Sequence, residues 1–180
     1  MAGGSILFLD LATQMGWAEG VPGDKPTFGT VRLAPVGSSP AAIFGGMIDW
    51  LGTRLQALRY RRIVYEAPLD PRWMNQPRSA ETARVLLGLP AVVEGVAYQM
   101  GYYGPSLAEA NVQDVRKHLL GVKPQKGDGK RLVMQRLRAL GYEPQDDNAG
   151  DALAGWLYAS ALADSRIAQM TSELFAPGKK

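Results

Sequence analysis

Three groups of acidic residues lie at the edges of apolar segments. Asp10 and Glu66 each end a short apolar run, and Asp146, Asp147 and Asp151 precede the last long apolar segment. A charge at the end of a buried segment costs free energy unless it has a partner or a function. Because this placement recurs three times, the pattern indicates a metal site that folding assembles.

The other side chains narrow the choice of metal. The chain has no cysteine, and His118 is its single histidine. Disulfides, thiolate zinc sites, cysteine nucleophiles and multi-histidine metal sites are therefore excluded. Carboxylate and amide oxygens remain, and these suit Mg²⁺, with Mn²⁺ as a substitute. No small-molecule cofactor is expected.

Two Mg²⁺ ions about 4 Å apart can hydrolyse a phosphodiester, because they activate water, neutralise the phosphate and stabilise the leaving oxygen. We expect Asp10 to bridge both ions and Glu66 to bind one. Asp147 and Asp151, four residues apart on one helix face, would complete the other shell, with Asn148 as a possible amide ligand. Asp147 could instead be only the helix cap. Without metal, at least one acid should have a raised pKa.

Basic residues concentrate between residues 111 and 138, where only Asp114 and Asp128 oppose them. They are Arg116, Lys117, Lys123, Lys126, Lys130, Arg131, Arg136 and Arg138. Such a stretch beside buried acids suits an enzyme that acts on a polyanion, although a solvated helix face is the alternative. The candidates for phosphate contacts are Lys117, Lys123, Lys126 and Lys130.

The segment after Glu66 is rich in proline and polar residues and reads as a loop. Its Arg72, Trp73 and Arg78 could bind DNA, with the tryptophan stacked on unpaired bases at a branch point. Alternatively, Trp73 covers a core edge or a dimer contact.

The apolar and turn patterns predict an α/β chain of three strands, a helix, a strand, a helix, a strand and further helices. The predicted strands are 6–10, 16–19, 26–33, 63–66 and part of 102–110. The predicted helices are 41–60, 80–100 with a kink or break at Pro90, 112–120 capped by Asn111, 130–140, and a last one capped by Asp147 or Asn148 that runs to about residue 170.

The length of 180 residues suits one domain, residues 1–180, with residues 171–180 as a flexible tail. No apolar run approaches the ~20 residues that span a membrane, and the first residues lack a secretory signal. These features favour a cytoplasmic protein.

The element order resembles the ribonuclease H-like fold, and four motifs resemble the RuvC-type Holliday junction resolvases, especially their phage-like members. The motifs are Asp10 with Gly16-Trp17, then Tyr65-Glu66-Ala67, then Arg116-Lys117 with Gly127-Asp128-Gly129-Lys130, and finally Asp151-Ala152-Leu153-Ala154. One position departs from the family, which often has aspartate or histidine where this chain has Asn148.

The resemblance implies a mixed five-stranded sheet, with three antiparallel N-terminal strands and then two strands that alternate with helices. It also implies a homodimeric, Mg²⁺-dependent endonuclease that cuts four-way DNA junctions in pairs, in a bacterial cell or encoded by a phage. Lys117 and Lys130 match the family's basic motif best.

Three other functions remain open at this point. The chain could be a nuclease for other branched DNA, for RNA or for hybrids, or a junction-binding protein without cleavage. A nucleotide-binding relative of the sugar kinase and actin fold is disfavoured, because the chain is short and lacks the second glycine-rich phosphate loop.

Overall fold

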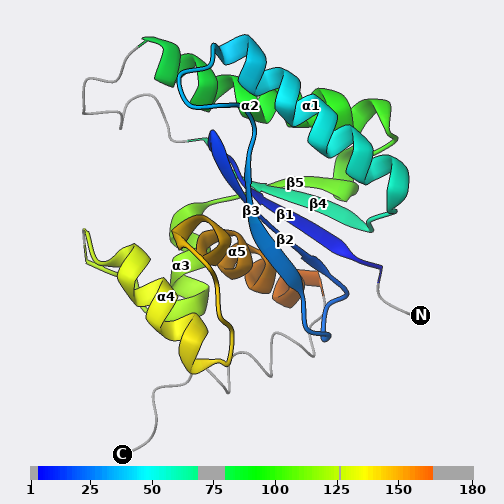
Figure 1. Cartoon of the computed structure of the whole chain (residues 1–180). Helices are drawn as coiled ribbons and strands as arrows, with labels where there is room; N and C mark the ends of the chain where they lie inside the picture. The colour runs from blue at the N-terminus through cyan, green and yellow to red at the C-terminus, as the bar shows by residue number, and fades with distance from the viewer. Residues whose placement is uncertain (1–3, 69–79, 126, 164–180) are drawn as a thin grey trace, which may run out of the picture.

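The computed structural model describes residues 4–68, 80–125 and 127–163, and its centre is a five-stranded sheet (Figure 1). The strands are β1 (Ile6–Asp10), β2 (Gln14–Gly20), β3 (Thr27–Arg32), β4 (Arg62–Glu66) and β5 (Leu107–Ala110), in the spatial order β3-β2-β1-β4-β5. β1, β2 and β3 pair antiparallel, whereas β4 is parallel to β1 and β5 is parallel to β4. The predicted mixed sheet is confirmed.

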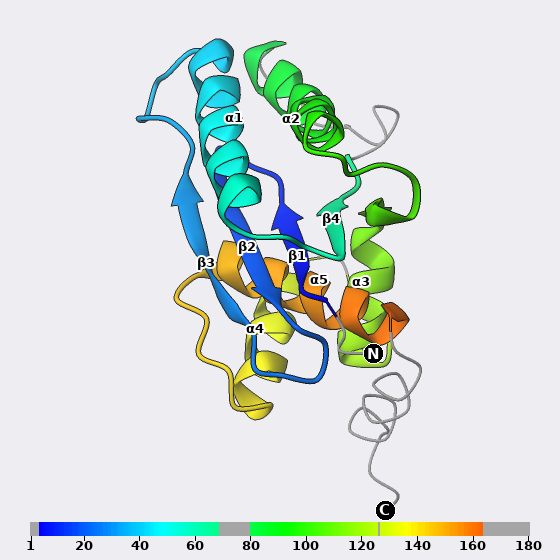
Figure 2. The same ribbon diagram turned by 90° about the vertical axis from the view of Figure 1, so that its right-hand side faces the viewer.

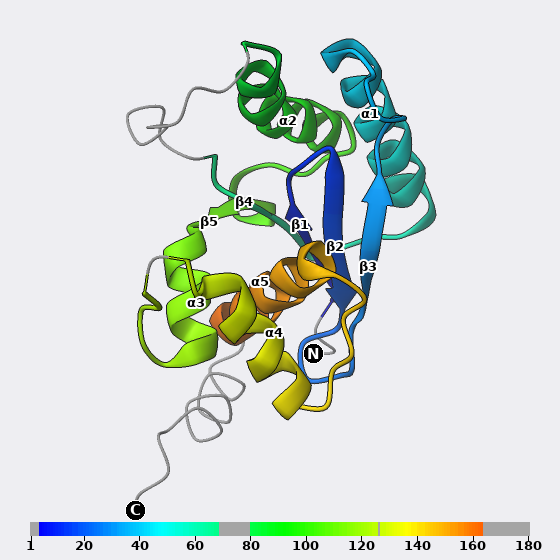
Figure 3. The same ribbon diagram turned by 60° about the vertical axis from the view of Figure 1, so that its left-hand side comes forward.

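Helices cover both faces of this sheet. They are α1 (Pro40–Ala57), α2 (Ala80–Gln99), α3 (Val112–Leu120), α4 (Gly129–Ala139) and α5 (Asp147–Ala163), with a short 3₁₀ turn, η2 (Gly104–Ser106), before β5. Figure 2 shows α1 and α2 together on one side of the sheet and α5 on the other. In Figure 3, α3 and α4 lie beside α5.

The core is divided by the sheet into two apolar clusters, and β1 alternates between them. Leu7 and Leu9 pack in the cluster under α1 and α2, whereas Ile6 and Phe8 pack in the cluster under α5. This alternation follows from the period of two in a strand. Asp10, two residues after Phe8, therefore belongs to the face that α5 covers.

Helix α5 lies unusually close to the sheet. A Cβ added at Gly155 would stand 2.1 Å from the Phe8 ring, so only glycine allows this approach. Beside it, the buried Trp156 Nε1 donates a hydrogen bond of 3.1 Å to the Ile6 carbonyl of β1. These contacts fix α5 against the central strand.

The predicted elements agree with the structure to within about three residues at the ends that it describes. The predicted break at Pro90 is wrong, because α2 continues through this buried residue, whereas the alternative of a kink there stays a prediction. The predicted end of the last helix lies outside the described residues. Among the described residues, no helix is both long and apolar enough to cross a bilayer.

Candidate metal centre

Asp10 and Glu66 are neighbours at the ends of two parallel strands. The register pairs Leu9 with Tyr65, so the next residues, Asp10 and Glu66, stand side by side. Both point to the α5 face, because Val64 shares the apolar cluster of Phe8. Their carboxyl groups form a direct hydrogen bond, which lowers the pKa of Asp10 and raises that of Glu66.

Burial and mutual repulsion raise the pKa values of both acids. Burial raises the pKa of Asp10 to about 7, with a further contribution from the charge of Asp151 on α5. Burial raises the pKa of Glu66 to about 8, with the charges of Asp10 and Asp151 adding to the effect. The expectation of a raised pKa is confirmed. Neighbouring carboxyl groups with raised pKa values are typical of sites that bind a cation or transfer a proton.

Asp151 completes a group of three carboxyls from three elements. Its side chain is 12% exposed, and burial raises its pKa. Two cations oppose that effect: Arg116 Nη2 and Lys130 Nζ each lie 3.9 Å from Asp151 Oδ2. Asp151 therefore stands between the acids of the sheet and the cations of α3 and α4.

The chemistry of these three side chains fits a hard divalent ion. They supply only carboxylate oxygens, which Mg²⁺ and Mn²⁺ prefer, and their strain would be relieved by a positive charge. In the described part of the chain, no three acidic or histidine side chains already lie at ligand spacing around one point. Metal binding would therefore require these side chains to rearrange from the positions that they have here.

The structure places Asp147 at the margin of this group. Its side chain is 56% exposed, and its Oδ2 lies 4.0 Å from Lys130 Nζ. Its charge still reaches Asp151, whose pKa it helps to raise. Asn148 is half-buried. The assignment of Asp147 or Asn148 as a metal ligand remains a prediction.

The predicted cap of the last helix is wrong. Helix α5 begins at Asp147, and the residue before it, Asp146, accepts a hydrogen bond of 2.9 Å from Ala149 N at its side chain. Asp146 therefore occupies the N-cap position instead of Asp147 or Asn148. The sequence pattern could not separate these three adjacent polar residues, because each is a good cap.

Comparison with known proteins gives no sequence match: no family model and no curated protein matches the chain. Solved structures do match. RuvC of Thermus thermophilus, in complex with a Holliday junction substrate, has a TM-score of 0.61 at 17% identity, covering 93% of this chain and 96% of that chain. A second structure of the same RuvC gives a TM-score of 0.61 at 17% identity, covering 92% and 96%.

The yeast mitochondrial Holliday junction resolvase Ydc2 also matches, with a TM-score of 0.61 at 11% identity, covering 94% of this chain and 83% of that chain. The chain has the fold of RuvC. The resemblance to the RuvC-type, ribonuclease H-like fold is thus confirmed over most of the chain, and at these identities the likeness concerns the fold.

Within this RuvC fold, the basic segment meets the acids through Arg116 and Lys130 rather than through Lys117. Val115 and Leu119 are buried among residues of α5, which turns Arg116 toward Asp151 and leaves Lys117 exposed. Sequence analysis missed Arg116 as a site residue. The signal was the helical spacing of Val115 and Leu119, which fixes the rotation of α3.

The other predicted DNA-binding residues are exposed or lie outside the described residues. Lys123 is exposed in the segment between α3 and α4. Lys126, Arg72, Trp73 and Arg78 lie outside the described residues, so their roles remain predictions.

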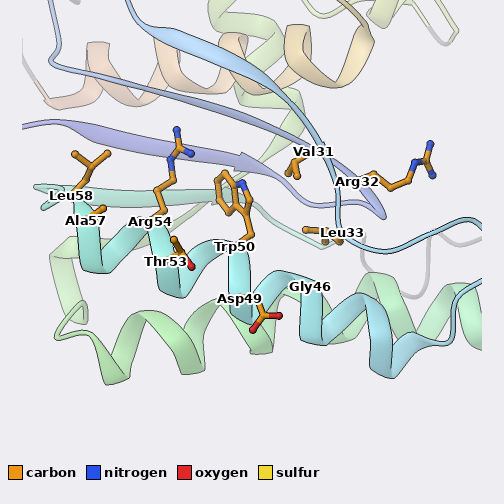
Figure 4. A pocket seen from close by; sticks show the side chains of 10 residues that line it. All are labelled: Val31, Arg32, Leu33, Gly46, Asp49, Trp50, Thr53, Arg54, Ala57 and Leu58. Atoms are coloured by element: carbon orange, nitrogen blue, oxygen red, sulfur yellow. The ribbon is translucent and has the colours of Figure 1, made fainter.

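A pocket of about 590 Å³ lies on the opposite face of the RuvC fold, between α1 and β3 (Figure 4). Trp50 and Arg54 project from α1 toward the strands. The Arg54 guanidinium lies over the rings of Trp17 and Trp50 and forms a salt bridge of 2.6 Å with Glu19, which also accepts a hydrogen bond from Tyr60. This network fastens α1 to the sheet, and none of the three grouped acids lines the pocket.

Proposed function

We propose that this protein is a Mg²⁺-dependent endonuclease that resolves four-way DNA junctions by paired phosphodiester hydrolysis. The observation that carries the proposal is the group of Asp10, Glu66 and Asp151, three partly buried carboxyls of raised pKa beside Arg116 and Lys130. The fold supports it, because a RuvC structure of the same fold holds a Holliday junction substrate.

Asp10, Glu66 and Asp151 would hold the metal, with Asp147 as a fourth ligand and Asn148 as a possible amide ligand. Two bound Mg²⁺ ions would supply an activated water and a stabilised leaving oxygen. The acidic residues of the chain would hold these ions in position. Asp10 adjoins Glu66 on the neighbouring strand and is within reach of the charge of Asp151, so we expect it to serve both ions. Glu66, whose pKa is raised to about 8, must give up its proton before it can act as a ligand.

Arg116 and Lys130 would bind the phosphate groups next to the scissile bond. Both lie within 4 Å of Asp151, so they place positive charge at the edge of the acidic group without occupying it. Lys117, Lys123, Lys126, Arg72, Trp73 and Arg78 would extend this surface along the DNA. Such contacts position a backbone and make binding sensitive to salt.

We also propose that residues 1–180 form one nuclease domain that acts as a homodimer. A four-way junction has approximate two-fold symmetry, and a C₂ dimer would present one acidic group to each of two strands. Analytical ultracentrifugation with and without junction DNA tests this state. A monomer bound to an uncut junction would contradict it.

The decisive experiment compares labelled four-way junctions, three-way junctions, flaps, RNA–DNA hybrids and linear duplex DNA in Mg²⁺. We expect symmetric nicks in the four-way junction and their loss in Asp10→Asn and Glu66→Gln. Glu109→Gln is the matched control, because Glu109 accepts a hydrogen bond from Tyr65, which packs in the cluster of the other sheet face.

Each alternative has its own outcome in this experiment. Preferred cleavage of flaps, RNA or hybrids would favour the broader nuclease function. Tight junction binding without cleavage in Mg²⁺ or Mn²⁺ would favour a binding protein. Full cleavage by Asp10→Asn would refute the metal site itself.

A further inference from the structure

The Asp146 side chain joins three elements next to the acidic group. Its Oδ1 accepts hydrogen bonds from Ala149 N of α5 at 2.9 Å and from Thr30 Oγ1 of β3 at 2.6 Å. Its Oδ2 accepts a longer one, 3.4 Å, from Gln14 Nε2 of β2. An N-cap needs only the first of these bonds. The other two tie the start of α5 to two strands.

Gln14 is itself held in place. Arg32 Nη2, at the end of β3, donates a hydrogen bond of 2.6 Å to Gln14 Oε1, which leaves Gln14 Nε2 directed at Asp146. The residues Arg32, Gln14, Thr30 and Asp146 thus form one continuous polar network, which we call the α5 tether. It spans β3, β2 and the start of α5.

The backbone beneath the tether leaves no room for α5 to shift toward the sheet. Gly16 pairs with Asp10 in the sheet register, and a Cβ at Gly16 would stand 2.0 Å from the Asn148 carbonyl oxygen. The first turn of α5 therefore rests on the strand position directly opposite Asp10. Gly16 sets the closest approach of the helix, and the tether prevents the helix from moving away.

We propose that Asp146 is a positioning residue that sets the separation of Asp151 from Asp10 and Glu66. Asp151 is one turn into α5, so a movement of the first turn moves its carboxyl by a similar amount. Carboxylates that share a metal tolerate little displacement, and groups that orient ligands affect metal affinity strongly. The identity of the bound ion rests on the proposed function, whereas the tether itself does not.

Three variants separate this role from simple capping. Asp146→Ala removes the cap and both bonds from the strands to α5. Thr30→Val removes the β3 bond and leaves the cap, and Asp146→Asn keeps an oxygen that can accept from both Ala149 N and Thr30 Oγ1. The matched control is Ser39→Ala, because Ser39 caps α1 on the other sheet face through a bond from Ala42 N alone.

Two properties of each variant are measured at a temperature where it is folded: its affinity for Mn²⁺ and its hydrogen exchange. Mn²⁺ titration calorimetry should show a Kd about 10-fold weaker for Asp146→Ala and Thr30→Val, near the lower end for such orienting groups, and an almost unchanged Kd for Asp146→Asn and Ser39→Ala. Hydrogen exchange in the metal-free protein should show faster exchange at Gly150 and Asp151 in the first two variants only.

The outcomes distinguish the tether from the proposed function. If the unmodified protein binds Mn²⁺ and Thr30→Val binds it equally well with unchanged exchange, the positioning role is refuted while the metal site stands. If the unmodified protein binds no Mn²⁺, the proposed function fails, and unchanged exchange in Thr30→Val then refutes the tether separately. Thr30→Val retains the helix cap, so it decides the matter even if Asp146→Ala does not fold.

Discussion

The carboxyl groups of Asp10 and Glu66 form a hydrogen bond across two parallel strands. Two acids can share a proton in this way only if at least one of them stays protonated near neutral pH. Burial and the nearby Asp151 provide that condition. In the metal-free protein, the acids that would bind cations in the proposed function therefore keep a proton near neutral pH.

The first prediction concerns pH and stability. The folded state holds protons on Asp10 and Glu66 up to pH values of about 7 and 8, whereas the unfolded chain loses them near 4. The unfolding free energy of the metal-free protein should therefore fall as the pH rises from about 4 to about 8. Each acid that is protonated only in the folded state lowers it by about 1.4 kcal/mol per pH unit. Urea denaturation in EDTA at pH 5, 6.5 and 8 measures the fall. A stability that rises across this range would contradict the raised pKa values.

The second prediction is that Asp10→Asn abolishes Mn²⁺ binding and cleavage but raises the unfolding free energy of the metal-free protein. It removes a buried charge that repels Asp151 and Glu66, so the metal-free protein should gain roughly 1–3 kcal/mol at pH 8. Most of that gain should vanish at pH 5, where the acid is protonated. Mn²⁺ binding and DNA cleavage should be lost at both pH values. Calorimetric unfolding at the two pH values checks the gain, and a variant less stable than the parent at pH 8 would argue against a strained site.

The third prediction concerns Arg116 and Lys130. If each contacts a phosphate, Arg116→Ala and Lys130→Ala should weaken junction binding and reduce the slope of log K against log salt by about one each. Binding is measured on Asp10→Asn protein, so that the DNA stays intact. Lys25→Ala is the control, because Lys25 is exposed in the β2–β3 connection at the far end of the sheet. Unchanged slopes in both variants would remove these residues from the DNA surface.

The fourth prediction concerns the approach of α5 to the sheet. Gly155→Ala should destabilise the protein by about 1–3 kcal/mol or more, because its Cβ would overlap the Phe8 ring at 2.1 Å. Gly52→Ala in α1 meets no neighbour within 4 Å, so it should stabilise the protein by about 0.5–1 kcal/mol. Thermal unfolding of the two variants side by side gives the test. Equal effects would mean that α5 packs less closely against Phe8.

Much of this architecture could be predicted from the sequence, since local pattern decides it. The apolar runs before Asp10 and Glu66 indicate two buried strands, each of which ends in an acid. That both acids lie on one sheet face follows from the register, which pairs Leu9 with Tyr65. The approach of Asp151 follows from its place one turn into a long apolar helix. These relationships depend on spacing, which a sequence displays directly.

The remaining features depend on contacts between residues far apart in the chain. Helical spacing favours Asp147 over Asp146 as the residue that joins Asp151. The role of Asp146 could not be predicted, because its partners Thr30 and Gln14 lie 116 and 132 positions away in the chain. The choice between Arg116 and Lys117 depends on how α3 is rotated against α5. Pro90 is expected to interrupt α2, but burial of the helix against the core outweighs the missing hydrogen bond.

The order of the acids along the chain has a consequence for synthesis. Asp10 and Glu66 leave the ribosome early, whereas Asp151 arrives only with the last described helix. Because α5 must dock on β1 before the third carboxyl joins the other two, the acidic group stays incomplete until the residues of α5 have been made. The three acids therefore come together only after residues 147–163 have been synthesised and have packed on the sheet.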